Sequence, residues 1–226
     1  MKAVILAGGL GKRLRPLTSD RPKPLVEVAG KPIIVHQLEW LKEHDITEVI
    51  ICAGYLKEVL IKHLGSGQKY GVHIAYVVEE EPLGTGGALA NAAPLLRNEE
   101  GFFVLNGDII TDLDPWHLTE LEERFVGSIA LVPLPCPYGV VELGPEGEVR
   151  VFYEKPVLKE HLINAGVYFF RPDVLPQLPT RGDLERTTLP MLAMARSLKG
   201  VVYEDVFWKA IDTVKDVEEA ERRLCA

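Results

Sequence analysis

Residues 3–13 decide the fold, and they read Ala3-Val4-Ile5-Leu6-Ala7-Gly8-Gly9-Leu10-Gly11-Lys12-Arg13. The first five are apolar and predict a short buried strand. The glycines that follow allow a tight turn, whose bare backbone N–H groups can surround an anion. Cations are frequent in and after this loop, namely Lys12, Arg13, Arg15, Arg21, Lys23 and Lys31. A strand that ends in such a loop predicts a site for a polyphosphate, and so for a nucleotide.

Two common phosphate-binding motifs do not match this loop. A P-loop would need a glycine where Leu6 stands and Ser or Thr where Arg13 follows Gly-Lys. A dinucleotide fingerprint would need a third glycine where the chain has Leu14. The sequence therefore argues against a P-loop ATPase and against an NAD-dependent oxidoreductase.

Composition indicates one globular domain over residues 1–226. The chain has 25 Lys and Arg against 33 Asp and Glu, a net charge of −8. An acidic surface repels nucleic acid and anionic membranes, so we expect neither as a partner. The basic loop is a local exception and suits a small anionic substrate.

The cysteines and the apolar runs predict a cytoplasmic protein. Cys52, Cys136 and Cys225 are far apart and lack metal-site spacing, which fits a reducing compartment. The first apolar run is too short for the core of a signal peptide, and no run is long enough to span a membrane. No hexapeptide repeat is present, so we expect no β-helix in these residues. A homo-oligomer is possible.

The order of apolar runs predicts an α/β fold that is Rossmann-like, with three α/β/α layers and a mostly parallel mixed sheet. Strands are expected at 3–7, 48–53, 73–78 and 102–105, and helices between them at 33–44, 56–64 and 85–96. Continuous Val and Ile runs indicate strands that are covered on both faces. Strands that alternate with helices predict right-handed parallel connections.

The pattern changes after about residue 126. Short strands are expected at 128–133, 140–143, 149–154 and 163–170, with helices at 184–197 and 217–224. This second part is rich in hairpins. We expect a nucleotide-binding part at about 1–125 and a sugar-binding part at about 126–226 within one nucleotidyltransferase domain.

The ordered motifs resemble those of the sugar-1-phosphate nucleotidylyltransferases, of the mannose-1-phosphate guanylyltransferase type. The family signature Leu-Ala-Gly-Gly-x-Gly-x-Arg-Leu-x-Pro-Leu-Thr is matched from Leu6 to Thr18. The resemblance continues over most of the chain at Pro22-Lys23-Pro24, Pro82-Leu83-Gly84-Thr85-Gly86-Gly87, Asn106-Gly107-Asp108, Glu154-Lys155-Pro156 and Asn164-Ala165-Gly166. Each motif alone is weak, but the ordered set is specific.

The resemblance implies transfer of a nucleoside monophosphate from an NTP to a sugar 1-phosphate, with release of pyrophosphate. The acceptor phosphate is already anionic, so no general base is needed, and the protein has to position and neutralise two polyanions. Catalytic roles fall by resemblance on Arg13, Lys23 and Asp108. The implied nucleotide-binding residues are Leu6, Ala7, Gly8, Gly9, Gly11, Arg13, Glu79, Gly84 and Gly87.

The resemblance also implies a Mg²⁺ ion, which prefers a few carboxylates together with phosphate oxygens. Asp108 follows a predicted strand and is one expected ligand, although Asn-Gly-Asp is also a common turn. Asp212 is the second, but the family's usual glycine after this position is missing, and Asp212 could instead cap a helix. The sugar phosphate is expected at Gly139, Glu154, Lys155, Asn164 and Gly166.

Glu79 indicates which base is bound. A carboxylate only accepts hydrogen bonds, and guanine presents two adjacent donors, N1–H and the N2 amine. GTP is therefore the expected nucleotide, and mannose 1-phosphate or a related sugar phosphate is what the resemblance to mannose- and heptose-1-phosphate guanylyltransferases implies. The ending Ile211-Asp212-Thr213-Val214-Lys215-Asp216 is more like glucose-1-phosphate cytidylyltransferases. Alternatives are a glucose-1-phosphate cytidylyl-, thymidylyl- or uridylyltransferase, a phosphocholine-type cytidylyltransferase, and a nucleotide-sugar sensor without catalysis.

Overall fold

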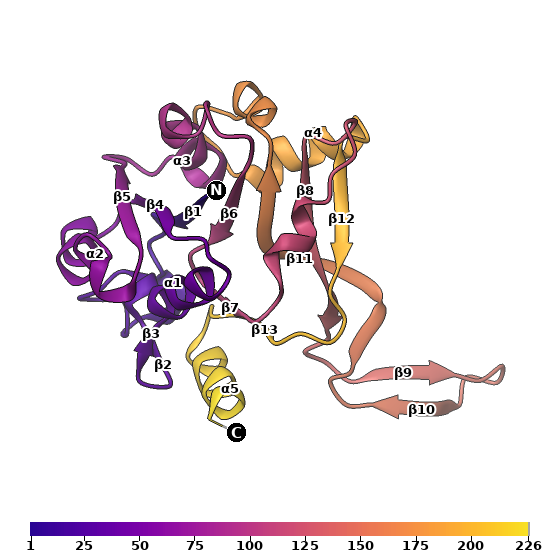
Figure 1. Cartoon of the computed structure of the whole chain (residues 1–226). Coiled ribbons are helices and arrows are strands. Elements are labelled where there is room, and N and C mark those ends of the chain that lie inside the picture. Colours follow the sequence, from indigo (N-terminus) through magenta and orange to yellow (C-terminus); the bar gives the residue numbers. More distant parts are fainter. Residues whose placement is uncertain (226) are drawn as a thin grey trace.

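A seven-stranded mixed sheet forms the centre of the molecule, in a computed structural model that describes residues 1–225 (Figure 1). The strand order is β12-β8-β11-β6-β1-β4-β5. Every strand of this sheet is parallel to β1 except β11, which is antiparallel to both of its neighbours. The bounds are β1 Lys2–Ala7, β4 Glu48–Ala53, β5 His73–Val78, β6 Phe102–Asn106, β8 Gly127–Pro135, β11 Val157–Phe170 and β12 Leu198–Val202.

Helices cover both faces of the sheet, because the side chains of each central strand alternate between two apolar clusters. In β1, Ile5 packs with α1 (Ile33–Glu43) and α2 (Lys57–Leu64). Val4 packs on the other face with α3 (Gly84–Ala92) and α4 (Thr188–Met194). The expected α/β fold with a mostly parallel mixed sheet is confirmed.

A third apolar cluster lies under the last helix, α5 (Val214–Leu224). Val217 and Ala220 of α5 pack against Leu14 and Val26 from the N-terminal segment. Nearby are two small antiparallel pairs, β2 (Glu27–Val28) with β3 (Lys31–Pro32), and β7 (Ile109–Thr111) with β13 (Trp208–Ala210). The last helix therefore lies against the segment that follows β1.

A hairpin of β9 (Val140–Leu143) and β10 (Val149–Tyr153) projects from the body of the molecule (Figure 1). It pairs with no other strand among residues 1–225. Large apolar side chains on it are exposed, including Leu143, Val149 and Phe152. The shorter turns of 3₁₀-helix elsewhere span Lys12–Leu14, Lys23–Leu25, Gln68–Tyr70, Ala93–Leu95, Pro115–Thr119, Pro172–Gln177 and Leu184–Arg186.

The expected elements differ from the observed ones mainly in the second part. The helix expected at 184–197 is wrong: the segment forms a 3₁₀ turn, then α4, and β12 begins at Leu198. The Thr85 side chain accepts a hydrogen bond from Leu184 N–H, which ties the start of this segment to α3. The helix expected at 85–96 ends at Ala92, α5 starts three residues before 217, and β11 starts at Val157 rather than 163. Within residues 1–225, every helix is too short or too polar to cross a bilayer.

Candidate active site

A cavity of about 450 Å³ opens where β1 and β6 end. The chain leaves β1 toward β4 on one side, whereas β6 leads toward the strands on the other side. Open α/β sheets bind ligands at such a switch point, outside the carboxyl ends of the strands. The cavity is lined by Leu6, Ala7, Gly8, Gly9, Leu10, Gly11, Lys12, Arg13, Leu14, Lys23, Pro24, Glu79, Pro82, Gly84, Thr85, Ala88, Asn106, Gly107, Asp108, Asp183 and Asp212.

The glycine loop after β1 presents free amide groups to this cavity. No acceptor among residues 1–225 takes the backbone N–H of Gly9, Leu10 or Gly11. Gly11 has a φ of 59°, and its carbonyl accepts a hydrogen bond of 2.8 Å from the buried Thr18 hydroxyl. A loop fixed in this way offers its N–H groups to an anion.

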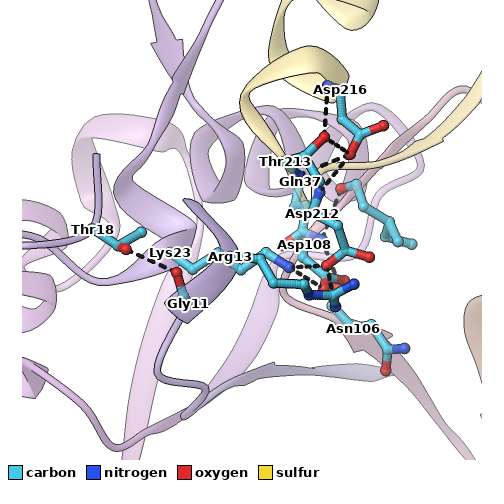
Figure 2. Close-up of polar contacts among 11 residues, drawn as sticks. Gly11, Arg13, Thr18, Lys23, Gln37, Asn106, Asp108, Asp212, Thr213 and Asp216 are labelled. Carbon is cyan, nitrogen blue, oxygen red and sulfur yellow. Dashed lines mark hydrogen bonds and ion pairs between the residues drawn. The ribbon is translucent and has the colours of Figure 1, made fainter. Parts of the chain in front are cut away.

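Two cations and two carboxylates meet at one side of the cavity (Figure 2). Lys23 Nζ lies 2.6 Å from Asp108 Oδ2 and 2.7 Å from Asp212 Oδ1. Arg13 donates to the same Asp212 oxygen over 2.8 Å. Lys23 is only 13% exposed along its side chain, whereas Arg13 is 71% exposed. The residues expected to act in catalysis and to hold the metal are thus brought together.

The pairing of β7 with β13 brings the two carboxylates together across about a hundred residues of sequence. Ile109 is opposite Ala210 in this pair, and Ile211 N–H donates to the Asp108 carbonyl over 2.8 Å. The next residue is Asp212. The short pair therefore fixes the separation between Asp108 and Asp212, which local sequence patterns do not reveal.

Asp212 does not cap a helix. Thr213 is the N-cap of α5, and it forms a capping box with Asp216. The Asp216 carboxylate also accepts from Asp212 N–H, and its other oxygen pairs with Lys209 Nζ at 2.7 Å. Burial raises the pKa of Asp216, but the hydrogen bonds from Lys209 and Thr213 outweigh it and lower the pKa overall. The Asp212 backbone is thus held by its neighbours, and its carboxylate lines the cavity, where it pairs with Lys23 and Arg13.

Gly107 allows β1 and the turn after β6 to approach closely. Its N–H donates to the Leu6 carbonyl over 3.0 Å, and a Cβ added at Gly107 would lie 2.6 Å from that carbonyl oxygen.

Gly107→Ala should therefore lower the free energy of unfolding by about 1–3 kcal/mol, measured by chemical denaturation. Gly9→Ala is the matched control, since a Cβ there meets nothing within 4 Å. Equal stability of both variants would contradict this account.

Gly84, Gly86 and Gly87 pack against a loop at residues 180–183. Gly86 N–H and Gly87 N–H both donate to the Gly182 carbonyl, over 2.9 and 3.2 Å, and Gly182 N–H donates to Leu83. A Cβ at Gly87 would lie 2.9 Å from the Thr180 carbonyl oxygen. Gly84 lines the cavity, but Gly87 does not. The run therefore packs against residues 180–183 and brings Asp183 to the cavity.

Glu79 follows β5 and lines the cavity on the side of Gly84. Its Oε2 accepts from Leu83 N–H over 3.2 Å. Its Oε1 lies so close to Gly8 that a Cβ on that residue would clash with it. Burial raises the pKa of Glu79, although the Leu83 hydrogen bond acts in the opposite direction.

The residues expected at the sugar phosphate fall into two groups. Asn164 and Gly166 lie in β11 near the cavity, where Gly166 N–H donates to Asn164 Oδ1 and a Cβ on Gly166 would meet the Asn106 amide. Glu154 and Lys155 directly follow β10, and Gly139 precedes β9 and faces Phe152. None of these five lines the cavity.

The sequence of this chain is similar to a known protein family. The family model described as "Nucleotidyl transferase" matches residues 2–226. The chain belongs to the nucleotidyl transferase family. A relative from Dictyostelium discoideum, named mannose-1-phosphate guanylyltransferase catalytic subunit beta, is 40% identical over 96% of this chain. The alignment spans 62% of that relative's length.

Solved structures have the same fold. HddC from Yersinia pseudotuberculosis, complexed with GMP-PN, is 28% identical with a TM-score of 0.77 and covers 99% of both chains. A putative glucose-1-phosphate thymidylyltransferase from Bacillus anthracis, in complex with a sucrose, is 27% identical with a TM-score of 0.79. It covers 99% of this chain and 94% of its own.

Several residues that line the cavity were not predicted from the sequence as site residues. Thr85 and Asp183 come together because the Thr85 hydroxyl donates to Glu185 and accepts from Leu184 N–H. Asp183 carries no sequence signal, since its position depends on how residues 180–183 pack against the glycines of α3. Pro82 lies inside a recognised motif and could have been named.

Proposed function

We propose that this chain transfers a nucleoside monophosphate from an NTP to a sugar 1-phosphate, giving a nucleotide sugar and pyrophosphate. The observation that carries the proposal is the meeting of Lys23 with Asp108 and Asp212 beside the free amides of the glycine loop. Together these groups supply donors, a largely buried cation and two carboxylates at one end of a cavity. Phosphoryl chemistry on a polyanion needs this combination.

In this proposal the chain's own residues position and neutralise the phosphates. The N–H groups of Gly9 and Gly11 bind phosphate oxygens, and Arg13 approaches from the exposed rim. Lys23 faces the α-phosphoryl group and stabilises the charge that develops as the sugar phosphate attacks and pyrophosphate leaves. The attacking phosphate is anionic near neutral pH, so no residue has to remove a proton from it.

Asp108 and Asp212 fit a Mg²⁺ ion. Their oxygens both lie within hydrogen-bonding distance of one nitrogen, Lys23 Nζ, so the two carboxylates converge on a single cationic position. Two carboxylates with open space for phosphate oxygens and water match the ligands that Mg²⁺ prefers. When bound there, the ion would neutralise charge on the triphosphate.

GTP and mannose 1-phosphate are the proposed substrates. The relative from Dictyostelium discoideum is named for this pair, and the HddC structure holds GMP-PN. Glu79 in the cavity supplies an acceptor that suits the N1–H and N2 amine of guanine. On the acceptor side, we propose Asn164 and Gly166 from β11, with Gly139, Glu154 and Lys155 from the hairpin.

The cysteines bear on the cellular location of the protein. Cys52, Cys136 and Cys225 are all free thiols, which fits a reducing cytoplasm, and we propose that location.

A pH series should reveal the role of Glu79. Because burial raises its pKa, lowering the pH protonates Glu79 sooner than an ordinary glutamate, and a protonated carboxyl is a poorer acceptor. The KM for GTP should therefore rise as the pH falls through that raised pKa. The contribution of Glu79 to the free energy of unfolding should have its own pH dependence. Because the folded protein disfavours the charged carboxylate, this contribution is present at low pH, where Glu79 is protonated, and is lost as the pH rises through the raised pKa.

Glu79→Gln should remove the pH dependence of the KM for GTP and that of the stability. It should also raise the KM for GTP more than the KM for the sugar phosphate. Steady-state kinetics and thermal unfolding, each across a pH series, measure these changes. Glu80→Gln is the matched control, because Glu80 is an exposed neighbour that pairs with Lys57. A Glu79→Gln enzyme with the wild-type pH profile for GTP would remove Glu79 from base recognition.

A pyrophosphate-release screen tests the function directly. ATP, CTP, GTP, UTP and dTTP are each combined with mannose 1-phosphate, glucose 1-phosphate, heptose 1-phosphate or phosphocholine in the presence of Mg²⁺. Release with GTP and mannose 1-phosphate is the expected result. Release only with CTP, UTP or dTTP would replace GTP while keeping the transfer, and no release in any combination would contradict the proposal.

A further inference from the structure

We infer that Gln37 is a positioning residue for the Asp108 carboxylate, and through it for the divalent cation. This inference rests on the proposed metal role of Asp108. Gln37 is on α1, is 3% exposed and does not line the cavity. Its Nε2 donates to the carbonyls of Asn106 over 2.8 Å and of Ile109 over 3.0 Å. One side-chain amide thus bridges the two residues on either side of the Gly107–Asp108 turn (Figure 2).

Three elements hold this turn. Leu6 at the end of β1 accepts from Gly107 N–H, and Ile211 after β13 donates to the Asp108 carbonyl. Gln37 supplies the third contact from α1, and within residues 1–225 it is the only side chain that hydrogen-bonds to the backbone of 106–109. Without it, the Asn106 and Ile109 carbonyls lose the donor they share.

The placement of Gln37 indicates that its two donors are needed. Its neighbours on the same face of α1, Ile34, Leu38 and Leu41, are fully buried and apolar. Gln37 Oε1 is also buried, and it has no hydrogen-bond partner within the described residues. A buried unpaired carbonyl is unfavourable, and Leu or Met would fill this space without it. A flipped amide would place Oε1 against two carbonyl oxygens, so the orientation is fixed.

The consequence concerns metal affinity more than nucleotide affinity. Asp108 is carried by the turn that Gln37 holds, whereas the free amides and Lys23 belong to other segments. Loosening the turn lets the Asp108 carboxylate move away from Asp212. Residues that orient metal ligands in this way typically change metal affinity by about 10- to 100-fold.

Gln37→Met tests the inference with a readout that does not need turnover. Mn²⁺, followed by its EPR signal, is titrated into the protein with a non-hydrolysable GTP analogue. The Kd for Mn²⁺ should rise about 10- to 100-fold. In turnover, the Mg²⁺ concentration for half-maximal rate should rise by a similar factor, while the KM for GTP at saturating Mg²⁺ stays unchanged.

Ser128→Ala is the matched control. Its hydroxyl is buried and donates to the Leu118 carbonyl, outside the cavity lining, so the variant also loses a buried side-chain bond to the backbone. It should lower the thermal midpoint and leave the Mn²⁺ affinity as it is. If Gln37→Met does not fold, Gln37→His, which keeps one N–H donor, should show a smaller loss of affinity in the same direction.

The outcomes separate this inference from the proposed function. Weaker Mn²⁺ binding in the Gln37 variants supports the inference even where the wild-type protein transfers no nucleotide. Wild-type Mn²⁺ affinity in a folded Gln37→Met protein overturns it and leaves the proposed function standing. A wild-type protein that binds no Mn²⁺ with the GTP analogue overturns the inference as well.

Discussion

Lys23→Ala should lower kcat by about 10³-fold with GTP and mannose 1-phosphate, because it removes the largely buried cation that we propose stabilises the α-phosphoryl group. Lys23 is the group that contacts both Asp108 and Asp212 through one nitrogen, at 2.6 and 2.7 Å. The loss should be in kcat more than in the KM for GTP, since the loop amides and Arg13 remain. Steady-state kinetics with pyrophosphate detection measures the change.

Two controls accompany this experiment. Arg21→Ala removes a cation from the same segment that lies outside the cavity lining and pairs with Asp20, and it should keep the wild-type rate. Thermal unfolding of Lys23→Ala checks that the two carboxylates left without their cation do not unfold the protein. A folded Lys23→Ala enzyme with the wild-type kcat would show that Lys23 has no part in the reaction.

Asp108→Asn and Asp212→Asn should each lower the Mg²⁺-dependent kcat by about 10³-fold, because each removes a charged oxygen ligand of the Mg²⁺ ion that we propose they share. The double variant should lose little more than either single variant, since both residues serve one function. Rates at increasing Mg²⁺ concentration measure this, and a high concentration should restore the single variants in part.

Asp20→Asn is the matched control for charge, because Asp20 is exposed and lies outside the cavity. It should change neither the rate nor its dependence on Mg²⁺. Losses in the double variant that equal the product of the single losses would mean that Asp108 and Asp212 act independently. The proposed shared ion would then be wrong.

The strands around the site could be read from the sequence almost residue by residue. The strands expected at 3–7, 48–53 and 73–78 contain the continuous apolar runs 3–7, 49–53 and 74–78, and they match β1, β4 and β5 closely. This pattern is typical of parallel strands that are buried on both faces, as β1 and β4 are, whereas β5 lies at the edge of the sheet and is partly exposed. The glycine loop and Asp108 come just after strands, where open α/β sheets bind ligands. Lys23 does not, and only the resemblance of Pro22-Lys23-Pro24 to the family motif pointed to it.

The rest depended on contacts between distant segments. β7 and β13 have three residues each, too few for a periodic pattern, and their pairing decides where Asp212 lies. Gly84 and Gly87 were expected to bind the nucleotide; Gly84 lines the cavity, whereas Gly87 packs against residues 180 and 181. Gln37 did carry a signal, since it is a polar residue among the apolar positions of a predicted helix.

The most direct test of the account follows the α-phosphorus of GTP. The wild-type protein is incubated with Mg²⁺, mannose 1-phosphate and GTP that carries its label on the α-phosphate. The label should appear in GDP-mannose, and one unlabelled pyrophosphate should be released for each labelled product. Label that remains in GTP, or that appears in GMP or GDP without GDP-mannose, would contradict the claim that this cavity joins the two substrates.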